Sequence, residues 1–253
     1  MTTAHATSSP NRISTRLMLS KLGDARFLGH LDFARLVERS LRRSGLPVRH
    51  TEGFNPHMKV TFADALPVGV ASMGEWVTVT LSEDLAPDDV RARLAPALPG
   101  SVELVDVRQG IPPQDDGSVR YRLDVIDGRD SAASALDALL ASDSHLVKDA
   151  RRGRTLDVRP HLLRGELGER GLTVTLVAVD GRPPRPGPLM QALVAIAEQR
   201  DEPAPRFGLA TRLVDVPRHG DTTWHDDAEV PPGQGGSSSS STHERPKRAA
   251  SPS

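Results

Sequence analysis

The sequence shows one order of local patterns twice: strand, helix, two strands, helix, strand. Alternating apolar and polar residues predict strands, and apolar residues three or four apart predict helices. In the first half the predicted elements are a strand at 12–21, a helix at 30–44, extended segments at 47–50 and 58–62, a strand at 75–81, a helix at 86–97 and a strand at 102–107. Gly45 supplies a stop for the first helix. Gly69 and Gly74 are interpreted as a turn, and Glu75 either lies at a strand end, the favoured interpretation, or faces the site.

After a break at 110–117 the order begins again. The predicted elements are a strand at 121–126, a helix at 131–141, strands at 156–163 and 172–179, a helix at 188–199 and a strand at 209–216. This is the order of the ferredoxin-like fold, in which two helices cover one face of a four-stranded antiparallel sheet. The sequence therefore predicts an α+β protein of two tandem ferredoxin-like halves, at 12–110 and 118–217. The polar segment 218–253, which contains five consecutive serines, predicts a disordered tail.

Composition excludes several kinds of chemistry. The chain has no cysteine, so it can form no disulfide, no thiolate zinc site and no cysteine-held iron–sulfur cluster. The first residues are polar and lack the apolar core of a signal peptide, and no segment has the roughly 20 apolar residues of a membrane-spanning helix. We therefore expect a soluble, cytoplasmic protein without a membrane contact, in keeping with a reducing compartment.

The first predicted helix carries a row of arginines. Its basic residues recur three and four apart and so share one face: Arg35, Arg39, Arg42 and Arg43. Guanidinium groups bind phosphates bidentately, and a row of them can follow a phosphodiester backbone. On a chain of net charge -1, this local basic face indicates a local anionic partner such as RNA. The alternative is an ordinary solvated helix face on which Glu38 pairs with Arg42.

The loop that follows this helix concentrates titratable groups between two extended segments. Candidates for acid–base catalysis are His50, Glu52 and His57. Candidates for RNA or anion contact are Arg49, Phe54, Asn55 and Lys59. The alternative is a plain connecting loop in which His57 bonds to the backbone. A metal site formed by His30, His50 and His57 with Asp32 or Glu52 is not predicted, because these residues lack the spacing of a known zinc pattern.

A second basic segment precedes a predicted strand in the second half. It contains Lys148, Arg151, Arg152 and Arg154, and Arg159 follows within the strand. In a tandem arrangement these side chains could line the same groove as the arginine helix. The alternative is a basic hairpin arm with no ligand. Aromatic residues are few, with one Tyr, two Trp and five Phe, so base stacking across a sheet is not expected to dominate.

Several motifs together resemble one bacterial family, the radical-SAM-linked domain of unknown function. They are Phe27-Leu28-Gly29-His30-Leu31-Asp32, Glu38-Arg39-Ser40-Leu41-Arg42-Arg43-Ser44, Glu52-Gly53-Phe54-Asn55-Pro56-His57, Ala65-Leu66-Pro67-Val68-Gly69 with Glu75, and Leu156-Asp157-Val158-Arg159-Pro160. Members are fused to a radical SAM enzyme or encoded beside one. The resemblance implies a radical SAM protein as partner. It implies no bound cofactor for this chain, which has no cysteine to hold the cluster.

Three functions remain open from the sequence. The first is an accessory protein that binds RNA and presents it to a radical SAM or other modification enzyme. The second is an enzyme that acts on RNA or nucleotides through His57 or His50 with Glu52. The third is a protein-binding scaffold, since arginine rows also bind acidic proteins. No nucleotide-binding loop or serine-hydrolase motif is present, and the sequence predicts no oligomeric state.

Overall fold

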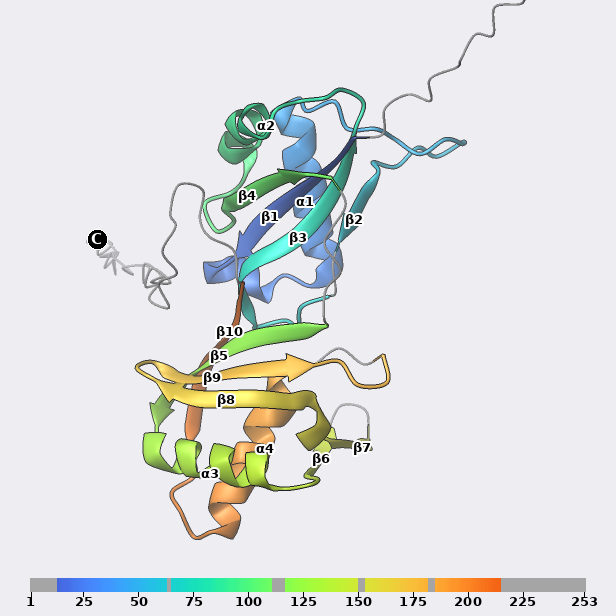
Figure 1. Ribbon diagram of the computed structural model, residues 1–253. Helices are drawn as coiled ribbons and strands as arrows, with labels where there is room; N and C mark the ends of the chain where they lie inside the picture. Colours follow the sequence, from blue (N-terminus) through green and yellow to red (C-terminus); the bar gives the residue numbers. More distant parts are fainter. Residues whose placement is uncertain (1–12, 63–64, 111–116, 150–152, 182–184, 215–253) are drawn as a thin grey trace, which may run out of the picture.

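The computed structural model describes residues 13–62, 65–110, 117–149, 153–181 and 185–214 (Figure 1). These residues form a mixed α+β protein with four α-helices and a mostly antiparallel sheet. The segment 218–253, predicted to be disordered, lies outside the described residues. Among the described residues, no helix is both long and apolar enough to cross a membrane.

The N-terminal half has the strand order β4-β1-β3-β2, and each neighbouring pair is antiparallel. Its elements are β1 (Ile13–Lys21), η1 (Gly23–Phe27), α1 (His30–Ser44), β2 (Val60–Phe62), β3 (Ala71–Leu81), α2 (Pro87–Leu94), η2 (Ala95–Ala97) and β4 (Leu104–Gln109), where η marks a short 3-10 helix. The predicted limits of α1 are confirmed. Gly45 ends it in the left-handed conformation, with φ of 65°.

The C-terminal half has the strand order β10-β5-β9-β8, again with antiparallel neighbours. Its elements are β5 (Ser118–Asp127), α3 (Arg129–Ala141), β6 (Leu146–Asp149), β7 (Arg154–Asp157), η3 (Arg159–His161), β8 (Leu162–Gly168), β9 (Gly171–Val177), α4 (Pro186–Gln199) and β10 (Arg206–Leu213). Strands β6 and β7 form a separate two-stranded hairpin.

A parallel strand pair joins the two halves into one sheet. Strand β10 pairs with the start of β3, with Thr211 opposite Ala71. Strand β2 pairs with a later part of the same edge, where Phe62 lies opposite Val77. The prediction of two separate antiparallel sheets was therefore wrong in this respect. Figure 1 shows β10 running between the two halves, with α3 and α4 in the C-terminal half and α1 and α2 in the N-terminal half.

Each half has its own apolar core. In the N-terminal core, Phe33, Val37 and Leu41 of α1 recur every four residues and pack with strand residues such as Leu17 and Val77. Burying a side chain of this size contributes about 1.5–3 kcal/mol. The C-terminal core is built by α3 and α4 against β5, β8 and β9, and it also includes two residues of the loop before β3, Leu66 and Val70. That loop therefore packs across the junction.

Two local predictions were wrong, and one strand was not predicted. Strand β3 begins at Ala71, so Gly74 lies in a strand and Glu75 lies in its middle. Gly74 is needed for close packing, because a Cβ there would lie 2.6 Å from Cγ of Met18. The predicted strand at 156–163 is broken by η3, which begins at Arg159 and contains Pro160. Strand β6 was not predicted, because four residues are too few to show a period.

The turn from β8 to β9 gives a test of this backbone arrangement. Gly171 has φ of 146°, and a Cβ at this position would overlap the carbonyl oxygen of Leu123 on β5. We expect Gly171→Ala to lower the free energy of unfolding by about 2–4 kcal/mol, from backbone strain and overpacking. The matched control is Gly187→Ala in α4, where no atom lies within 4 Å of the added carbon. Urea unfolding of both variants checks this, and equal effects would contradict it.

Candidate functional site

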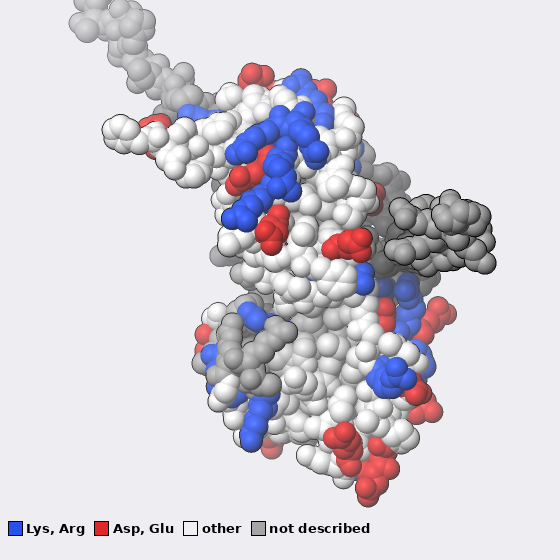
Figure 2. All heavy atoms as spheres, turned by 180° about the vertical axis from the view of Figure 1, so that it is seen from behind, with Lys and Arg blue, Asp and Glu red and all other residues white. Residues whose placement is uncertain are grey.

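The apolar stripe of α1 leaves its arginines on the solvent side of the helix. Figure 2 shows basic side chains gathered in one band on the N-terminal half, with carboxylates beside them. Arg35 pairs with Asp32 at 3.4 Å, and Arg42 pairs with Glu38 at 3.7 Å. All four side chains are at least 37% exposed, and such pairs contribute only about 0–1 kcal/mol. Both arginines can therefore exchange these partners for a phosphate at small cost.

The other two arginines of α1 differ in what they contact. Arg39 is exposed, and within the described part of the chain no hydrogen bond or ion pair holds its guanidinium group. Arg43 donates to the carbonyl oxygen of Ala97 at 2.5 Å and to Oγ of Ser40 at 3.3 Å, so it ties α1 to η2. Arg39 is thus the most available cation of the row, and Arg43 has a structural role.

The predicted loop forms a closed hairpin arm that projects from the N-terminal half (Figure 1). His50 bridges to Met58, and the backbone N–H of Thr51 donates to the carbonyl oxygen of His57 at 2.7 Å. The N–H of His57 donates to Oγ1 of Thr51 at 2.9 Å. Phe54 at the tip has a relative exposure of 112%. An apolar ring this exposed, on an arm fixed by backbone bonds, is available to a partner.

The candidate catalytic residues lie on this arm and are not enclosed in a pocket. His50, Glu52 and His57 are all exposed, as is Asn55. No hydrogen bond joins the side chains of the three candidates within the described residues. In that same part of the chain, no group of three or more potential metal ligands comes together. The arm thus brings the three candidates into one loop, but it does not align them.

Arg49 and Lys59 lie at the base of the arm. The N–H of Lys59 donates to the carbonyl oxygen of Arg49 at 2.8 Å, and Thr80 of β3 bonds to both backbones. Both side chains are half-buried. These bonds fix the base of the arm to the edge of the sheet, so the arm starts from a rigid support.

The second basic segment lies on the other half of the molecule. Arg154 is exposed on β7, in the lower part of Figure 1, whereas α1 is in the upper part. Arg151 and Arg152 lie outside the described residues. The guanidinium group of Arg159 donates to the carbonyl oxygens of Leu140, Ser142 and Leu162 at 2.8–3.1 Å. Arg159 therefore closes the end of α3, and neither Arg154 nor Arg159 lies beside α1.

Asp157 completes this structural cluster beside Arg159. Its carboxylate accepts the N–H groups of His145 and Arg159 at 2.9 and 3.1 Å and the hydroxyl of Ser144 at 2.8 Å. Burial acts to raise the pKa of Asp157, but these hydrogen bonds outweigh it and hold the pKa below its ordinary value. The motif around Asp157 and Arg159 thus builds the connection from α3 to β8.

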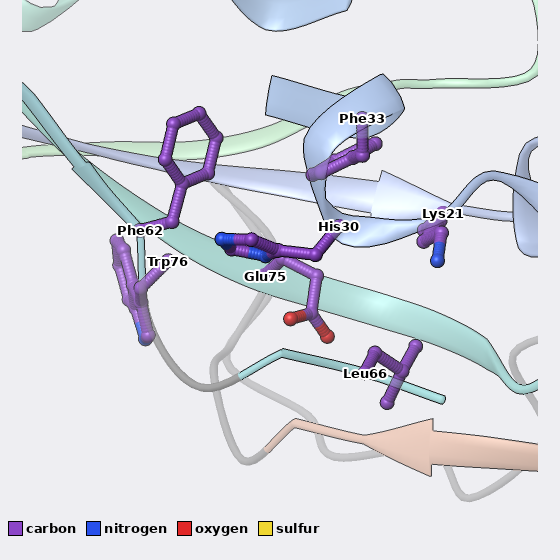
Figure 3. Close-up of a pocket in the computed structure, with 7 residues that line it drawn as sticks. All are labelled: Lys21, His30, Phe33, Phe62, Leu66, Glu75 and Trp76. Atoms are coloured by element: carbon purple, nitrogen blue, oxygen red, sulfur yellow. The ribbon is translucent and has the colours of Figure 1, made fainter. Parts of the chain in front are cut away.

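A pocket that the sequence did not indicate lies at the edge of β3. Among the described residues, no strand pairs with residues 73–76 on the side where β2 and β10 lie. The pocket opens at this gap. It is lined by Lys21, His30, Phe33, Phe62, Leu66, Glu75 and Trp76 (Figure 3). All of these residues belong to the N-terminal half, and Leu66 also packs against the C-terminal core.

The pocket contains buried charges. Lys21 is 2% exposed and Glu75 is 7% exposed. The ammonium group of Lys21 donates to the carbonyl oxygen of Leu28 at 2.9 Å, and Arg212 of β10 lies 3.6 Å from the Glu75 carboxylate. Burial lowers the pKa of Lys21, and Glu75 opposes that shift. Glu75 thus links a strand of the C-terminal half to the N-terminal half.

Aromatic contacts close one side of the pocket. The imidazole of His30 meets Phe62 edge-on at 5.7 Å between ring centroids, and Figure 3 shows the Glu75 carboxylate on the side of His30 toward Leu66. The one sequence signal for this site was a lysine and a glutamate at strand positions that otherwise hold apolar residues. His30, considered above as a metal ligand, packs on an aromatic ring instead.

The molecule described so far is an α+β protein with a basic helix face, a projecting aromatic arm and a charged junction. The chain belongs to the bacterial family described as "Uncharacterized protein conserved in bacteria (DUF2344)", whose model matches residues 14–185. No curated protein matches the chain significantly. A solved structure described as an unknown protein from Galdieria sulphuraria aligns with 80% of this chain and 99% of its own, at 14% identity and a TM-score of 0.25. A score this low supports no inference about fold or function.

Asp157 gives a prediction about pH. A carboxyl with a lowered pKa stabilises the fold above its ordinary value of 3.8, and this contribution is lost as the pH falls through the lowered pKa. We expect Asp157→Asn to cost about 1 kcal/mol at pH 7, with a smaller difference from the parent protein below pH 3.8. Urea unfolding at both pH values measures this. Asp143→Asn, a change at a nearby exposed residue, is the control, and a difference that does not shrink in acid would contradict the assignment.

Proposed function

We propose that this chain is an accessory protein that binds RNA through α1 and the hairpin arm and presents it to a modification enzyme. The observation that carries the proposal is the exposed row of Arg35, Arg39 and Arg42, two of them in weak surface pairs and one with no described partner. Released counterions favour binding of such a row to phosphates. The projecting Phe54 adds an aromatic face on which a base can stack.

The proposed partner is a radical SAM protein. The support is the resemblance of the helix and arm motifs to the radical-SAM-linked family. The proposal also rests on the absence of cysteine from this chain, because a step that needs an iron–sulfur cluster would then require another polypeptide. The division of labour is then simple: this chain holds the RNA, and the partner carries out the chemistry.

We further propose that the two halves are ferredoxin-like units in tandem. In each half the first strand lies between the third and the fourth, and the second strand pairs with the third. That is the arrangement expected when a β-α-β-β-α-β order forms an antiparallel sheet with both helices on one face. The hairpin of β6 and β7 is an insertion between α3 and β8. In this proposal, one unit carries the RNA surface and the other supports it.

The arm also supplies the alternative function, acid–base catalysis by His57 or His50 with Glu52. A catalytic base usually has an orienting partner and a site that excludes water. In the described residues these three side chains are exposed and no side-chain hydrogen bond orients them. RNA binding requires neither feature, so the geometry favours the binding protein.

RNA binding along α1 predicts a particular salt dependence. We expect Arg39→Ala/Arg42→Ala to weaken binding to single-stranded RNA across different sequences. We also expect it to reduce the slope of log affinity against log salt by about 1–2, because two phosphate contacts are lost. Filter binding over a salt series measures both quantities.

The control for this experiment removes the same charge elsewhere. Arg170 and Arg206 are exposed residues of the C-terminal half, so Arg170→Ala/Arg206→Ala should leave the affinity and the slope unchanged. The proposal is abandoned if the parent protein does not bind RNA at low salt, or if the two double variants lose affinity equally.

The arm gives a separate prediction. We expect Phe54→Ala to weaken RNA binding by about 1–3 kcal/mol, the range for loss of one stacked base, with the salt slope unchanged. Because Phe54 is fully exposed, its replacement should leave the melting temperature unchanged. Calorimetry and RNA binding over the same salt series test this, with Leu163→Ala, a change at an exposed apolar residue of the other half, as the control. Unchanged RNA affinity would exclude the arm from the binding surface.

A further inference from the structure

The sheet of the N-terminal half has a second face, opposite α1 and α2. Successive strand residues point to opposite faces. Leu17, Val77 and Val107 belong to the core under the helices, so their neighbours Arg16, Trp76 and Arg108 lie on the other face. Figure 1 shows α1 on one side of β1, β3 and β4, and among the described residues no helix lies on the other side of these strands. This second face is therefore distinct from the arginine row.

Arg16 is a buried cation in an unusual position on this face. It is 7% exposed, and its Nε atom is buried without a hydrogen-bond partner. Within the part of the chain that the structure describes, no hydrogen bond or ion pair is made by its guanidinium group. Its contact is with the ring of Trp76, whose centroid lies 4.0 Å from the guanidinium carbon. A cation–π contact restores only part of the hydration that a buried guanidinium loses.

Arg108, on the neighbouring strand, adds to the free-energy cost of burying the charge of Arg16. Arg108 lies opposite Arg16 in the register of β1 and β4, and like charges in this position repel. Burial lowers the pKa of Arg16, Arg108 lowers it further, and Asp106 opposes both. However, Asp106 already accepts Nε of Arg108 at 2.7 Å and the N–H of Val107 at 2.8 Å, with Arg91 at 4.0 Å. The carboxylate is shared among these partners, so positive charge remains in excess.

We propose that Arg16, Arg108 and Trp76 form a binding site for an oxyanion, specifically a phosphate group. A phosphate would accept hydrogen bonds from the two guanidinium groups and cancel their repulsion. It would reach the site beside Arg108, whose side chain is 44% exposed. Trp76 is half-buried and offers an indole to a ring attached to the phosphate. The phosphate group of a free nucleotide and that of an RNA strand share this chemistry.

If Arg16 has only a structural role, the predicted effect of its replacement on stability is the opposite of that expected for an anion-binding residue. If Arg16 served only to pack on Trp76, its removal would destabilise the protein. If Arg16 is kept for a ligand, an apolar residue of similar length should fit the space without the cost of the buried charge. Arg16→Met separates these cases, because the ligand-free protein should melt at a higher temperature in the second case and at a lower one in the first.

The test uses the fluorescence of Trp76 to report binding at the proposed site. The chain has two tryptophans, and Trp224→Phe leaves Trp76 as the single tryptophan of the full-length protein. Inorganic phosphate replaces chloride at constant ionic strength, followed by a nucleoside monophosphate and by a short single-stranded RNA. We expect a saturable change in fluorescence, weakened about tenfold or more by Arg16→Met or by Arg108→Met. Arg206→Met, an exposed arginine of β10, is the matched control.

Each outcome decides the question. Phosphate binding that is lost in both variants and kept in Arg206→Met supports the site. If Arg16→Met melts at a lower temperature than the parent protein or does not fold, Arg16 has a structural role, and the effect of Arg108→Met on phosphate binding then decides whether this face binds the anion. A response to the nucleotide without RNA identifies a free nucleotide as the source, and the reverse identifies RNA. Absence of any response, or equal affinity in all variants, overturns the proposal. Because the readout uses phosphate, failure of RNA binding at α1 leaves this result unaffected.

Discussion

The edge of β3 has two partners, and this double pairing sets the arrangement of the molecule. Strand β2 pairs with Val77–Val79, whereas β10 pairs with Ala71 and Ser72, so two segments distant in sequence meet on one strand. The last strand of the C-terminal half is thereby fixed against the N-terminal half. The residues of β3 between the two pairings form the gap at which the pocket opens. Placement of Leu66, Arg212 and the pocket wall follows from this one constraint.

Buried charge accompanies that junction. Lys21, Glu75 and Arg212 contact one another or the backbone near the point where β10 meets β3. Desolvation can cancel the attraction in such a cluster, so it is weak evidence of stability. Its value lies in specificity: a different register between the halves would leave a buried carboxylate without its cations. The charges thus favour one arrangement of the two halves. Apolar packing alone would discriminate less strongly between alternative arrangements.

Two surfaces of the N-terminal half share an excess of positive charge but differ physically. On α1 the arginines are exposed and weakly paired, which suits a long, salt-dependent contact with many phosphates. On the opposite sheet face, Arg16 is buried beside one aromatic ring, which suits a single anion held at short range. The C-terminal half differs again, since Arg159 is occupied by three backbone carbonyls. Arginine thus occurs in three environments, which differ in burial and in neighbouring acceptors.

Local patterns in the sequence determined the elements whose stabilising contacts are local. The apolar spacing from Phe33 to Leu41 fixed α1, and Gly45 fixed its end, because helix periodicity and a left-handed cap depend on neighbouring residues. The arginine row and the loop that forms the arm could also be predicted, because they too depend on neighbouring residues. Only the tertiary structure decided that β10 joins β3, that Glu75 is buried and that Arg159 closes α3. Strand pairing and buried ion contacts join residues far apart in the chain, and a one-dimensional pattern does not specify which of them meet.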